Sequence, residues 1–311
     1  MKTFLGIDTS NYTTSVALYS ENGVLQKKKL LPVKDGERGI RQSDAVFHHT
    51  KAYPDLLKEL FDIADYPEIF GVGASIKPTT QEGSYMPCFL VGEAVAKAIS
   101  VTNNIPFYSF SHQQGHIAAA LYSADKTELL NGDFLCFHIS GGTTDLVLCT
   151  PDDEEIFKAK LVAHSTDLKA GQAVDRIGVK MGIPFPAGMG VEKLALNSER
   201  IYKNKIKLID GNCSLSGLEN KCLKMLGNGD PQCDVAKFIF SYIADTVSAM
   251  TEYALKNYGN LPVVFAGGVM SNVIIKDIVT SRFDCSFAEP EFSCDNAAGI
   301  AFLTSIKANK R

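Results

Sequence analysis

The sequence predicts an α/β fold built from two similar halves with a cleft between them, and two observations carry this prediction. First, "IDTSNYTTSVAL" (7–18) and "FHISGGTTDLVL" (137–148) align without a gap at an offset of 130 residues. Second, apolar strand-like runs alternate with segments of helical spacing in both halves, as in strands joined by crossover helices. At 311 residues, the chain is long enough for two domains. The polar stretch near 125–132 predicts the boundary, which gives domains over residues 1–128 and 129–311.

The individual elements follow from the residue pattern in chain order. "MKTFLGIDTS" is a short apolar run that ends in an acid, which predicts a strand and excludes a signal peptide. Buried strands are predicted where short apolar runs are bounded by polar residues or glycine, at 69–75, 106–110 and 261–269. Helices are predicted where apolar residues recur at a spacing of three to four, at 54–64, 88–104, 234–259, 271–283 and 295–310.

The repeated segment at the start of each half predicts a hairpin with a polar tip. A strand enters a turn of Ser, Asn, Gly and Thr, and a second apolar strand leaves it. Backbone N–H groups and hydroxyls at such a tip suit a phosphate, because small residues let the backbone approach the anion closely. One copy alone fits an ordinary β-turn, whereas two copies favour a duplicated nucleotide-binding architecture.

Two of the six histidines lie four residues apart in "SHQQGHIAAAL" (111–121). Helix positions i and i+4 share one face, so His112 and His116 are close enough to bind a single metal ion. A helix N-terminus capped by Ser111, with both histidines near solvent, fits the same residues. The metal interpretation needs a third ligand from elsewhere in the chain.

The composition limits the kinds of partner and the cellular compartment that the sequence predicts. The net charge of −4 argues against a strongly basic nucleic-acid surface, but it leaves room for RNA contact through a local patch. The eight cysteines form no CxxC motif, which fits a reducing compartment. No window reaches about 18 uninterrupted apolar residues. We therefore expect a cytoplasmic protein that contacts neither membrane nor DNA.

These motifs, in this order and spacing, resemble the TsaD family of tRNA N6-adenosine threonylcarbamoyltransferases, also known as M22 glycoproteases or O-sialoglycoprotein endopeptidases. The resemblance runs from "GIDTS" near the start to "CDNAAGIAF" near the end, so it covers nearly the whole chain. It implies the duplicated, two-domain actin-like ATPase fold that sugar kinases and heat-shock ATPases share. The departures described below suggest a divergent bacterial paralogue.

The resemblance also supplies the missing metal ligand. The family's metal site uses two histidines of an HxxxH helix and the aspartate of a D-N-A-A segment, which here are His112, His116 and Asp295. Two imidazoles and one carboxylate with open positions suit one divalent iron or zinc ion. Asp295 also fits a plain helix N-cap. His138 stands where some members carry a metal-contacting tyrosine, and it fits either a fourth ligand or a core histidine.

Three segments resemble the family's nucleotide site: "SGGTTDL" (140–146), residues 167–195, and "GGVMSN" (267–272). They imply an adenine nucleotide, which would be threonylcarbamoyl-AMP, ATP or AMP. Taken singly, the carboxylates also fit solvated helix charges, and the asparagine fits a helix N-cap. The residues that the resemblance assigns to this site are His138, Ile139, Ser140, Gly141, Gly142, Asp175, Gly188, Glu192 and Asn272. "SLSGLENK" (214–221) resembles the family's FSFSGLKT, to which the sequence assigns no role.

The first loop departs from the family pattern. Where members read E-T-S-C-D-E-T, this chain reads "DTSNYTT", so Asn11 and Tyr12 replace two acids that are candidates for general-base work. The family's Y-G-G-V-V-P-E segment is also missing. In its place, His48 and His49 fit either a replacement acid–base pair or a solvated helix start.

The resemblance implies an acyltransferase. Relatives move the threonylcarbamoyl group from threonylcarbamoyl-AMP to N6 of the adenosine 3′ of a tRNA anticodon, with a metal ion assisting and small partner subunits of a synthesis complex. The changed first loop leaves two alternatives, a carbamoyl or acyl-adenylate transferase with another acceptor and a non-catalytic nucleotide-binding paralogue. A protease is disfavoured, because Gln113 and Gln114 stand where H-E-x-x-H enzymes carry their glutamate.

Overall fold

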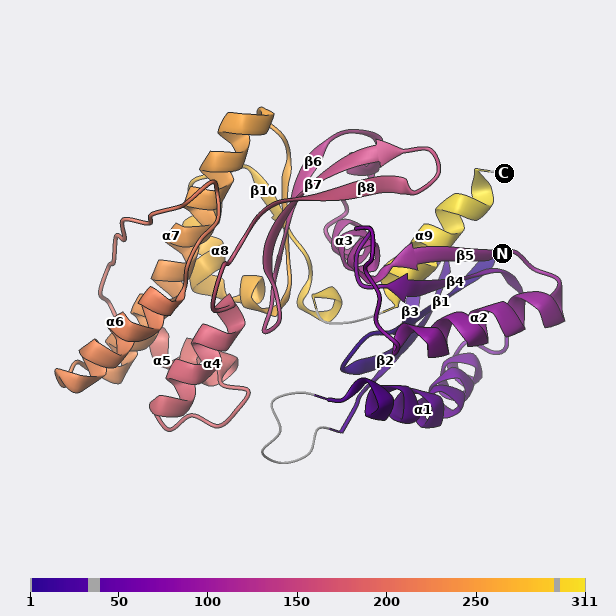
Figure 1. Ribbon diagram of the computed structural model, residues 1–311, viewed down its shortest axis with the longest axis horizontal. Helices are drawn as coiled ribbons and strands as arrows, with labels where there is room; N and C mark the ends of the chain where they lie inside the picture. Colours follow the sequence, from indigo (N-terminus) through magenta and orange to yellow (C-terminus); the bar gives the residue numbers. More distant parts are fainter. Residues whose placement is uncertain (1, 33–39, 294–296, 311) are drawn as a thin grey trace. The chain divides into compact units, whose positions relative to one another are not determined.

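The computed structural model describes residues 2–32, 40–293 and 297–310, and its chain forms two compact units (Figure 1). The first unit comprises residues 1–131, 150–159 and 291–311, and the second comprises residues 132–149 and 160–290. Each unit contributes a mixed sheet of five strands with helices packed on it. The α/β architecture with two similar halves is therefore confirmed, whereas the domain boundary at 128/129 stays a prediction.

The sheet of the first unit has the order β3-β2-β1-β4-β5. β1, β4 and β5 run parallel, and β2 and β3 extend the sheet as an antiparallel meander. The strands are β1 (Thr3–Thr9), β2 (Thr13–Ser20), β3 (Gly23–Leu30), β4 (Ile69–Lys77) and β5 (Phe107–Ser111). β3 lies at an edge and carries three consecutive lysines, which discourage pairing with another sheet.

The helices that the described residues place with this sheet are α1 (Gln42–Ile63), α2 (Phe89–Asn103), α3 (His112–Ser123) and α9 (Ala298–Asn309). α1 begins at Gln42, twelve residues before its predicted start. The prediction placed Pro54 at the helix N-terminus, where proline is favoured, but Pro54 lies inside the helix. Buried residues at helical spacing, among them Ala45, His49 and Leu56, show why the earlier residues join it.

The second sheet repeats the same topology. Its order, β10-β9-β6-β7-β8, matches the first sheet strand for strand when read from β8, and β6, β9 and β10 run parallel. The strands are β6 (Phe134–Ile139), β7 (Thr144–Asp152), β8 (Ile156–His164), β9 (Val263–Ala266) and β10 (Cys285–Phe287). The helices are α4 (Ala170–Lys180), α5 (Gly188–Ala195), α6 (Ser216–Gly227), α7 (Gln232–Tyr258) and α8 (Val273–Thr280), with a 3-10 turn at η2 (Gly268–Ser271). Two further 3-10 turns are η1 (Thr127–Asn131), in the first unit, and η3 (Pro290–Phe292), where the residue ranges of the two units meet.

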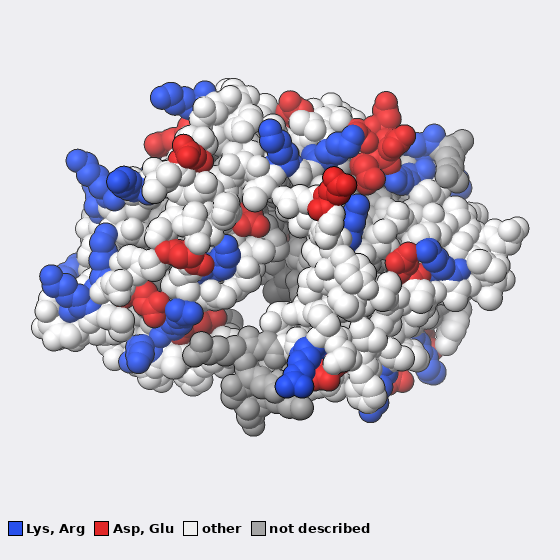
Figure 2. Space-filling model, viewed as in Figure 1, with Lys and Arg blue, Asp and Glu red and all other residues white. Residues whose placement is uncertain are grey.

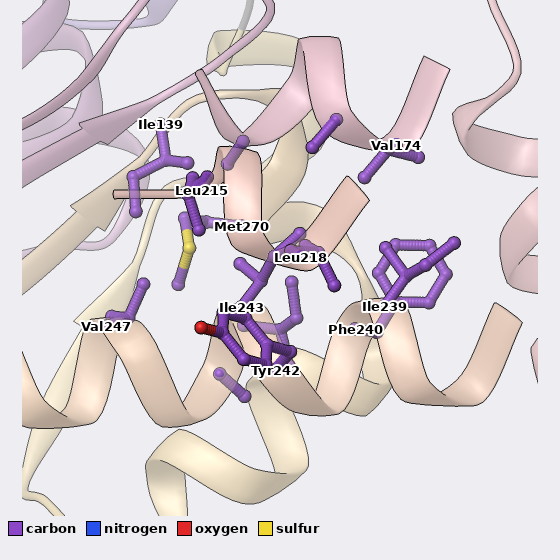
Figure 3. Packing of buried hydrophobic residues seen from close by; sticks show 14 of the residues in the cluster. Ile139, Val174, Leu215, Leu218, Ile239, Phe240, Tyr242, Ile243, Val247 and Met270 are labelled. Carbon is purple, nitrogen blue, oxygen red and sulfur yellow. The ribbon is translucent and has the colours of Figure 1, made fainter. Parts of the chain in front are cut away.

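The core of the second unit forms around α7, which is buried along most of its length. Side chains from α4, α6 and η2 and from the end of β6 pack onto it (Figure 3). Leu218 of α6 and Ile243 of α7 are almost fully buried in this cluster, as is Ile139 at the end of β6. None of the helices in the described part of the chain has both the length and the apolar character that crossing a bilayer requires.

Two glycines of the first unit allow α9 to pack with its backbone in direct contact with β1 and with α3. A Cβ on Gly6 of β1 would lie 2.3 Å from the backbone nitrogen of Ala301 in α9. A Cβ on Gly299 of α9 would lie 1.9 Å from the carbonyl oxygen of Gly115 in α3. α9 is therefore wedged against both the sheet and the helix that carries the histidine pair.

We expect Gly299→Ala to lower the free energy of unfolding by about 2–4 kcal/mol, because the added methyl group must displace the α3 backbone. Alanine itself favours the helix over glycine by up to about 1 kcal/mol, so the loss measures the overpacking. Denaturant unfolding monitored by circular dichroism checks this.

Gly217→Ala is the matched control, because Gly217 also lies in a helix but has no atom within 4 Å of its added Cβ. It should leave stability unchanged or raise it by less than about 1 kcal/mol. Equal losses in the two variants would contradict the packing argument.

Candidate functional site

The histidine pair lies at the start of α3 in the first unit. Ser111 caps the helix, since its Oγ accepts from Gln114 N at 3.1 Å and its own N–H donates to Gln114 Oε1 at 2.8 Å. The predicted N-cap is thus confirmed. His112 Nε2 and His116 Nε2 lie 2.9 Å apart, with their rings nearly perpendicular. His116 is only 5% exposed, so the alternative that placed both histidines near solvent is wrong for it.

A buried carboxylate sets the orientation of His112. Asp8 Oδ2 lies 2.6 Å from His112 Nδ1, and the Asp8 side chain is 1% exposed. The other oxygen of Asp8 accepts from the backbone N–H of Ser10 at 2.8 Å. A carboxylate that accepts the Nδ1 proton fixes the tautomer in which the lone pair lies on Nε2, the side that faces His116.

This pair fits a transition-metal ion. Two nitrogens bound to one zinc ion at about 2.0–2.1 Å lie about 2.9–3.4 Å apart, depending on the bond angle, and the observed separation is 2.9 Å. The Asp8 contact is the carboxylate that metal-binding histidines usually carry on their second nitrogen. Within residues 2–32, 40–293 and 297–310, no third His, Cys, Asp or Glu completes such a cluster. Asp295, the predicted third ligand, lies outside the described residues.

The first loop is held by neutral side chains. Asn11 Oδ1 accepts from Gln42 Nε2 at 2.5 Å, while Tyr12 is 40% exposed. His49 is fully buried and its Nδ1 lies 2.8 Å from Thr14 Oγ1. The solvated helix start expected for this histidine is therefore wrong, because α1 begins earlier and turns His49 inward. Burial lowers the pKa of His49, so its ring is neutral at pH 7.

In the second unit, the turn after β6, at residues 140–143, is closed by hydrogen bonds among its own residues. Ser140 Oγ accepts from the backbone N–H groups of Gly142 and Thr143, both at 3.2 Å. Gly171, in the first turn of α4, donates to the Ser140 carbonyl at 3.1 Å, and a Cβ on it would lie 2.7 Å from Gly141 N. The turn thus rests on the N-terminus of an eleven-residue helix, where N–H dipoles favour an anion.

The end of β9 lies beside this turn. Gly267 has φ +96°, and a Cβ on it would lie 2.2 Å from the Ile139 carbonyl oxygen, so only glycine fits there. After it, Asn272 caps α8 by accepting from Ile275 N at 3.0 Å, which confirms the predicted cap. Asn272 is 5% exposed, and its Nδ2 has no hydrogen-bond partner in the described part of the chain. Because buried polar groups are normally hydrogen-bonded, this amide is a candidate donor to a ligand that carries an acceptor.

The two predicted nucleotide carboxylates both bond to helix N-termini. Asp175 of α4 accepts from Ala187 N at 2.8 Å, just before Gly188 opens α5. Glu192 of α5 accepts from Val273 N at 2.8 Å, in the first turn of α8. Burial raises the pKa of Asp175, and the Ala187 N–H only partly offsets this. These contacts bring Glu192 next to Asn272.

His138 lies on β6, one residue before Ile139 and the turn. Its Nδ1 is 3.3 Å from Thr143 Oγ1, and its partners in the sheet register are Asp145 and Ala266. Burial raises the pKa of Asp145, with Lys169 and His164 acting in the opposite direction. Sequence reasoning passed over Asp145, and only the strand register could have paired it with His138.

A further aspartate, Asp167, holds the "SLSG" segment in place through hydrogen bonds. Asp167 accepts from Ser214 Oγ at 2.6 Å and from the backbone N–H groups of Leu215 at 2.8 Å and Leu168 at 2.6 Å. Burial alone would raise the pKa of Asp167, but these donors and Ser216 outweigh it and hold the pKa well below its usual range. Asp167 thus fixes the start of α6 to the loop that precedes α4.

Within each unit, the structure brings the predicted residues together. In the first unit, His112 and His116 face each other beside Asp8, which the sequence had placed only in the first strand. In the second unit, the turn after β6 contacts α4, while Glu192 and Asn272 meet at the start of α8. Their assigned roles in metal or nucleotide binding stay predictions.

Comparison with known proteins shows one family over most of the chain. A family model described as "TsaD: tRNA N6-adenosine threonylcarbamoyltransferase" matches residues 25–302. The tRNA N6-adenosine threonylcarbamoyltransferase of Kosmotoga olearia is 31% identical, and the match covers 98% of this chain and 93% of that protein. The protein of the same name from Neorickettsia sennetsu is 27% identical, over 96% of this chain and 91% of its own length.

Solved structures agree on the fold. Component A of the Acidaminococcus fermentans (R)-2-hydroxyglutaryl-CoA dehydratase superposes with a TM-score of 0.58 at 14% identity, covering 99% of this chain and 100% of that one. A ROK family glucokinase from Streptomyces griseus, solved with glucose and AMPPNP, superposes with a TM-score of 0.55 at 12% identity, covering 98% and 99%. The fold is therefore that of actin-like ATPases.

We expect Asp167→Asn to remove part of the acid sensitivity of this protein. Because the folded-state pKa of Asp167 is depressed, its contribution to stability is present above the unfolded-state value of about 3.9 and is lost as pH falls below it. Unfolding free energies measured between pH 7 and pH 3 should fall less steeply in the variant than in the wild type.

Asp153→Asn is the control, because Asp153 is exposed and its carboxylate makes no hydrogen bond or ion pair within the described residues. It should keep the wild-type slope. If Asp167→Asn also keeps it, the hydrogen-bonded carboxylate does not stabilise the fold.

Proposed function

Because this chain belongs to the TsaD family of tRNA N6-adenosine threonylcarbamoyltransferases, we propose that it transfers a threonylcarbamoyl group from threonylcarbamoyl-AMP to N6 of the adenosine 3′ of a tRNA anticodon. The observation that carries the proposal is the family match over residues 25–302. The Asp8–His112–His116 arrangement and the Asn272 amide, whose Nδ2 has no partner within the described residues, support it, because they suit the metal and the nucleotide that this reaction would use.

The reaction is acyl transfer from a mixed anhydride. The N6 lone pair attacks the carbamoyl carbon, a C–N bond forms, and the bond between that carbon and the phosphate oxygen breaks. AMP leaves with the electron pair, and N6 loses a proton. Since the anhydride is already activated, positioning of the two substrates supplies much of the rate.

His112 and His116 would hold one divalent iron or zinc ion, together with Asp295. When bound, the ion supplies a Lewis acid for substrate oxygens. The part of this chain is to orient the two imidazoles, and Asp8 does so by keeping the Nδ1 proton of His112 on the side away from His116. Second-sphere contacts of this kind strengthen metal binding.

The second unit would bind the adenylate. The backbone N–H groups around Gly141 and Gly142, with the N-terminus of α4 behind them, would stabilise the charge that grows on the departing phosphate. The Asn272 amide would donate to the nucleoside, which gives its buried Nδ2 a partner. Gly188, with no atom within 4 Å of an added Cβ, leaves room for the purine to approach the backbone.

One observation favours a second candidate, an acyl-adenylate transferase with a different acceptor. Asn11 and Tyr12 replace the paired acids of the family's first loop, and the Asn11 amide bonds to Gln42. Neither side chain is a carboxylate base, so the proton from the acceptor must be taken up elsewhere. A small-molecule acceptor that loses its proton to solvent would not need those acids.

We expect AMP to be released from threonylcarbamoyl-AMP by the wild-type protein only when unmodified tRNA is present. His112→Ala should abolish bound metal, measured by elemental analysis, and lower AMP release at least about 100-fold through loss of the ion. AMP release without tRNA, but with a small amine or hydroxyl compound, would select the second candidate instead.

Asp8→Asn sharpens this test, because it should weaken metal binding about 10–100-fold while both histidines stay in place. His48→Ala is the matched control, since His48 is a histidine of α1 whose ring packs against Phe47, 5.3 Å away between ring centres. It should keep wild-type metal content. Full metal content in His112→Ala would refute the assigned site.

We expect Asn272→Ser to weaken AMP binding about 5–10-fold, because it removes one buried hydrogen-bond donor worth about 1 kcal/mol. Serine still caps α8, so the free energy of unfolding should change by less than about 1 kcal/mol. Asn272→Ala loses the cap as well and should lower both quantities. Calorimetric titration with AMP and denaturant unfolding separate the two effects; unchanged AMP affinity in both variants would remove Asn272 from the site.

A further inference from the structure

The second unit carries an extended segment that belongs to neither sheet, at residues 201–209 between α5 and α6 (Figure 1). Its sequence, "IYKNKIKLI", alternates strictly between two sides. Tyr202, Asn204, Ile206 and Leu208 are half-buried against the unit, whereas Lys203, Lys205 and Lys207 are exposed. We call residues 201–209 the lysine strap.

The lysine strap is fixed along α7. The rings of Tyr202 and Phe238 lie 5.2 Å apart, edge to face. Asp245, a buried residue of α7, accepts from both the backbone N–H and the side-chain amide of Asn204, at 2.8 and 3.1 Å. Its other oxygen accepts from Arg282 at 2.7 Å. These contacts hold the inner side of the strap, so its three lysines point outward as a set.

The three lysines of the strap form no ion pair. Glu199 and Asp210 flank residues 201–209, but neither lies within ion-pair distance of Lys203, Lys205 or Lys207 in the described part of the chain. Two exposed lysines of α6, Lys221 and Lys224, add to the positive charge of the strap.

Ring contacts connect the two lysine groups. Lys221 Nζ lies 4.6 Å from the centre of the Tyr242 ring, and Tyr242 contacts Phe238 beneath the strap. Figure 2 shows Lys and Arg side chains gathered along the left edge of that view, where Figure 1 draws α6 and the extended segment.

The geometry of this row suits a phosphate backbone. Alternate residues of an extended chain lie about 6.6–6.8 Å apart, which is comparable to the separation of successive phosphates along an RNA strand. A lysine ammonium is a point charge, and it lacks the planar, two-pronged donor geometry with which arginine recognises base edges. A row of lysines therefore binds the phosphate backbone of a nucleic acid without distinguishing its sequence. A phosphorylated peptide would favour arginine clusters, and a membrane would favour a broad amphipathic face rather than a single row.

We propose that the lysine strap, with Lys221 and Lys224, binds the phosphate backbone of the tRNA substrate. This proposal rests on the proposed function for the identity of the RNA. Because the net charge of this chain is −4, a cationic row also favours approach of the RNA toward the face that carries it.

The test is a triple variant, Lys203→Gln with Lys205→Gln and Lys207→Gln, in the full-length protein. Its affinity for an unmodified tRNA transcript is measured at several salt concentrations. We expect the dissociation constant to rise at least about tenfold at low salt, and the slope of log K against log salt to shrink by about 2–3, at 0.7–0.9 per lost phosphate contact. Affinity for AMP should stay within about twofold of the wild type, because the strap lies outside the nucleotide residues.

Two controls match the variant. Arginine at the same three positions keeps the charge and should keep the wild-type slope. Gln in place of Lys2, Lys51 and Lys310, which are exposed lysines of the first unit, changes the net charge by the same amount and should leave tRNA affinity within about twofold.

The outcomes separate this proposal from the proposed function. Wild-type affinity and slope in the strap variant would overturn the strap while tRNA-dependent AMP release stands. Strap-dependent tRNA binding without AMP release would support the strap and count against the transferase. A wild-type protein that binds phosphatidylglycerol vesicles through these lysines, but not tRNA, would overturn the RNA proposal in favour of a membrane surface.

Discussion

The parallel alignment of β1, β4 and β5 is the constraint from which the histidine site follows. Parallel strands place their carboxyl ends at one edge of a sheet, so Asp8 near the end of β1 and His112 directly after β5 meet there although 104 residues separate them. The second sheet uses the same rule, because β6 and β9 are parallel and end side by side. The turn at Ser140 and the glycines after Ala266 therefore share one edge. The two units repeat one topology and differ in what they carry at that edge.

Close backbone packing keeps these edges in place. Gly267 against the Ile139 carbonyl, and Gly171 against Gly141, allow no side chain between the segments. Gly299 likewise allows α9 to pack closely against α3, because neither Gly299 nor Gly115 carries a side chain that would separate the two helix backbones. Carboxylates and amides then satisfy the helix N-termini, as Glu192 and Asn272 do at α8. In this way the residues proposed to bind nucleotide also hold the fold, so stability and affinity must be measured together in any variant.

The net charge of the chain and the local charge of the lysine strap lead to opposite expectations about nucleic-acid binding. A net charge of −4 argues against a strongly basic nucleic-acid surface, yet the lysine strap places three exposed lysines in one row on the second unit. The alternation that creates it can be read in "IYKNKIKLI", but an alternating run predicts a sheet strand. The absence of a strand partner, and the Asp245 contacts that turn Asn204 inward, could not be read from the sequence. They depend on α7 and Arg282, which lie 41 and 78 residues further along the chain.

The sequence alone determined the α/β class, the duplication, the Ser111 and Asn272 caps and the family, because each depends on residues close together or on motifs in a fixed order. Local chemistry also placed His112 and His116 on one helix face. Only the tertiary structure decided that Asp8 orients His112, that His49 is buried rather than solvated, and that Asp167 fixes the "SLSG" segment. The start of α1 belongs with these, since Pro54 predicts a helix N-terminus and burial of the preceding residues overrides it. Contacts between residues distant in sequence depend on strand order and helix packing, and no local pattern encodes them.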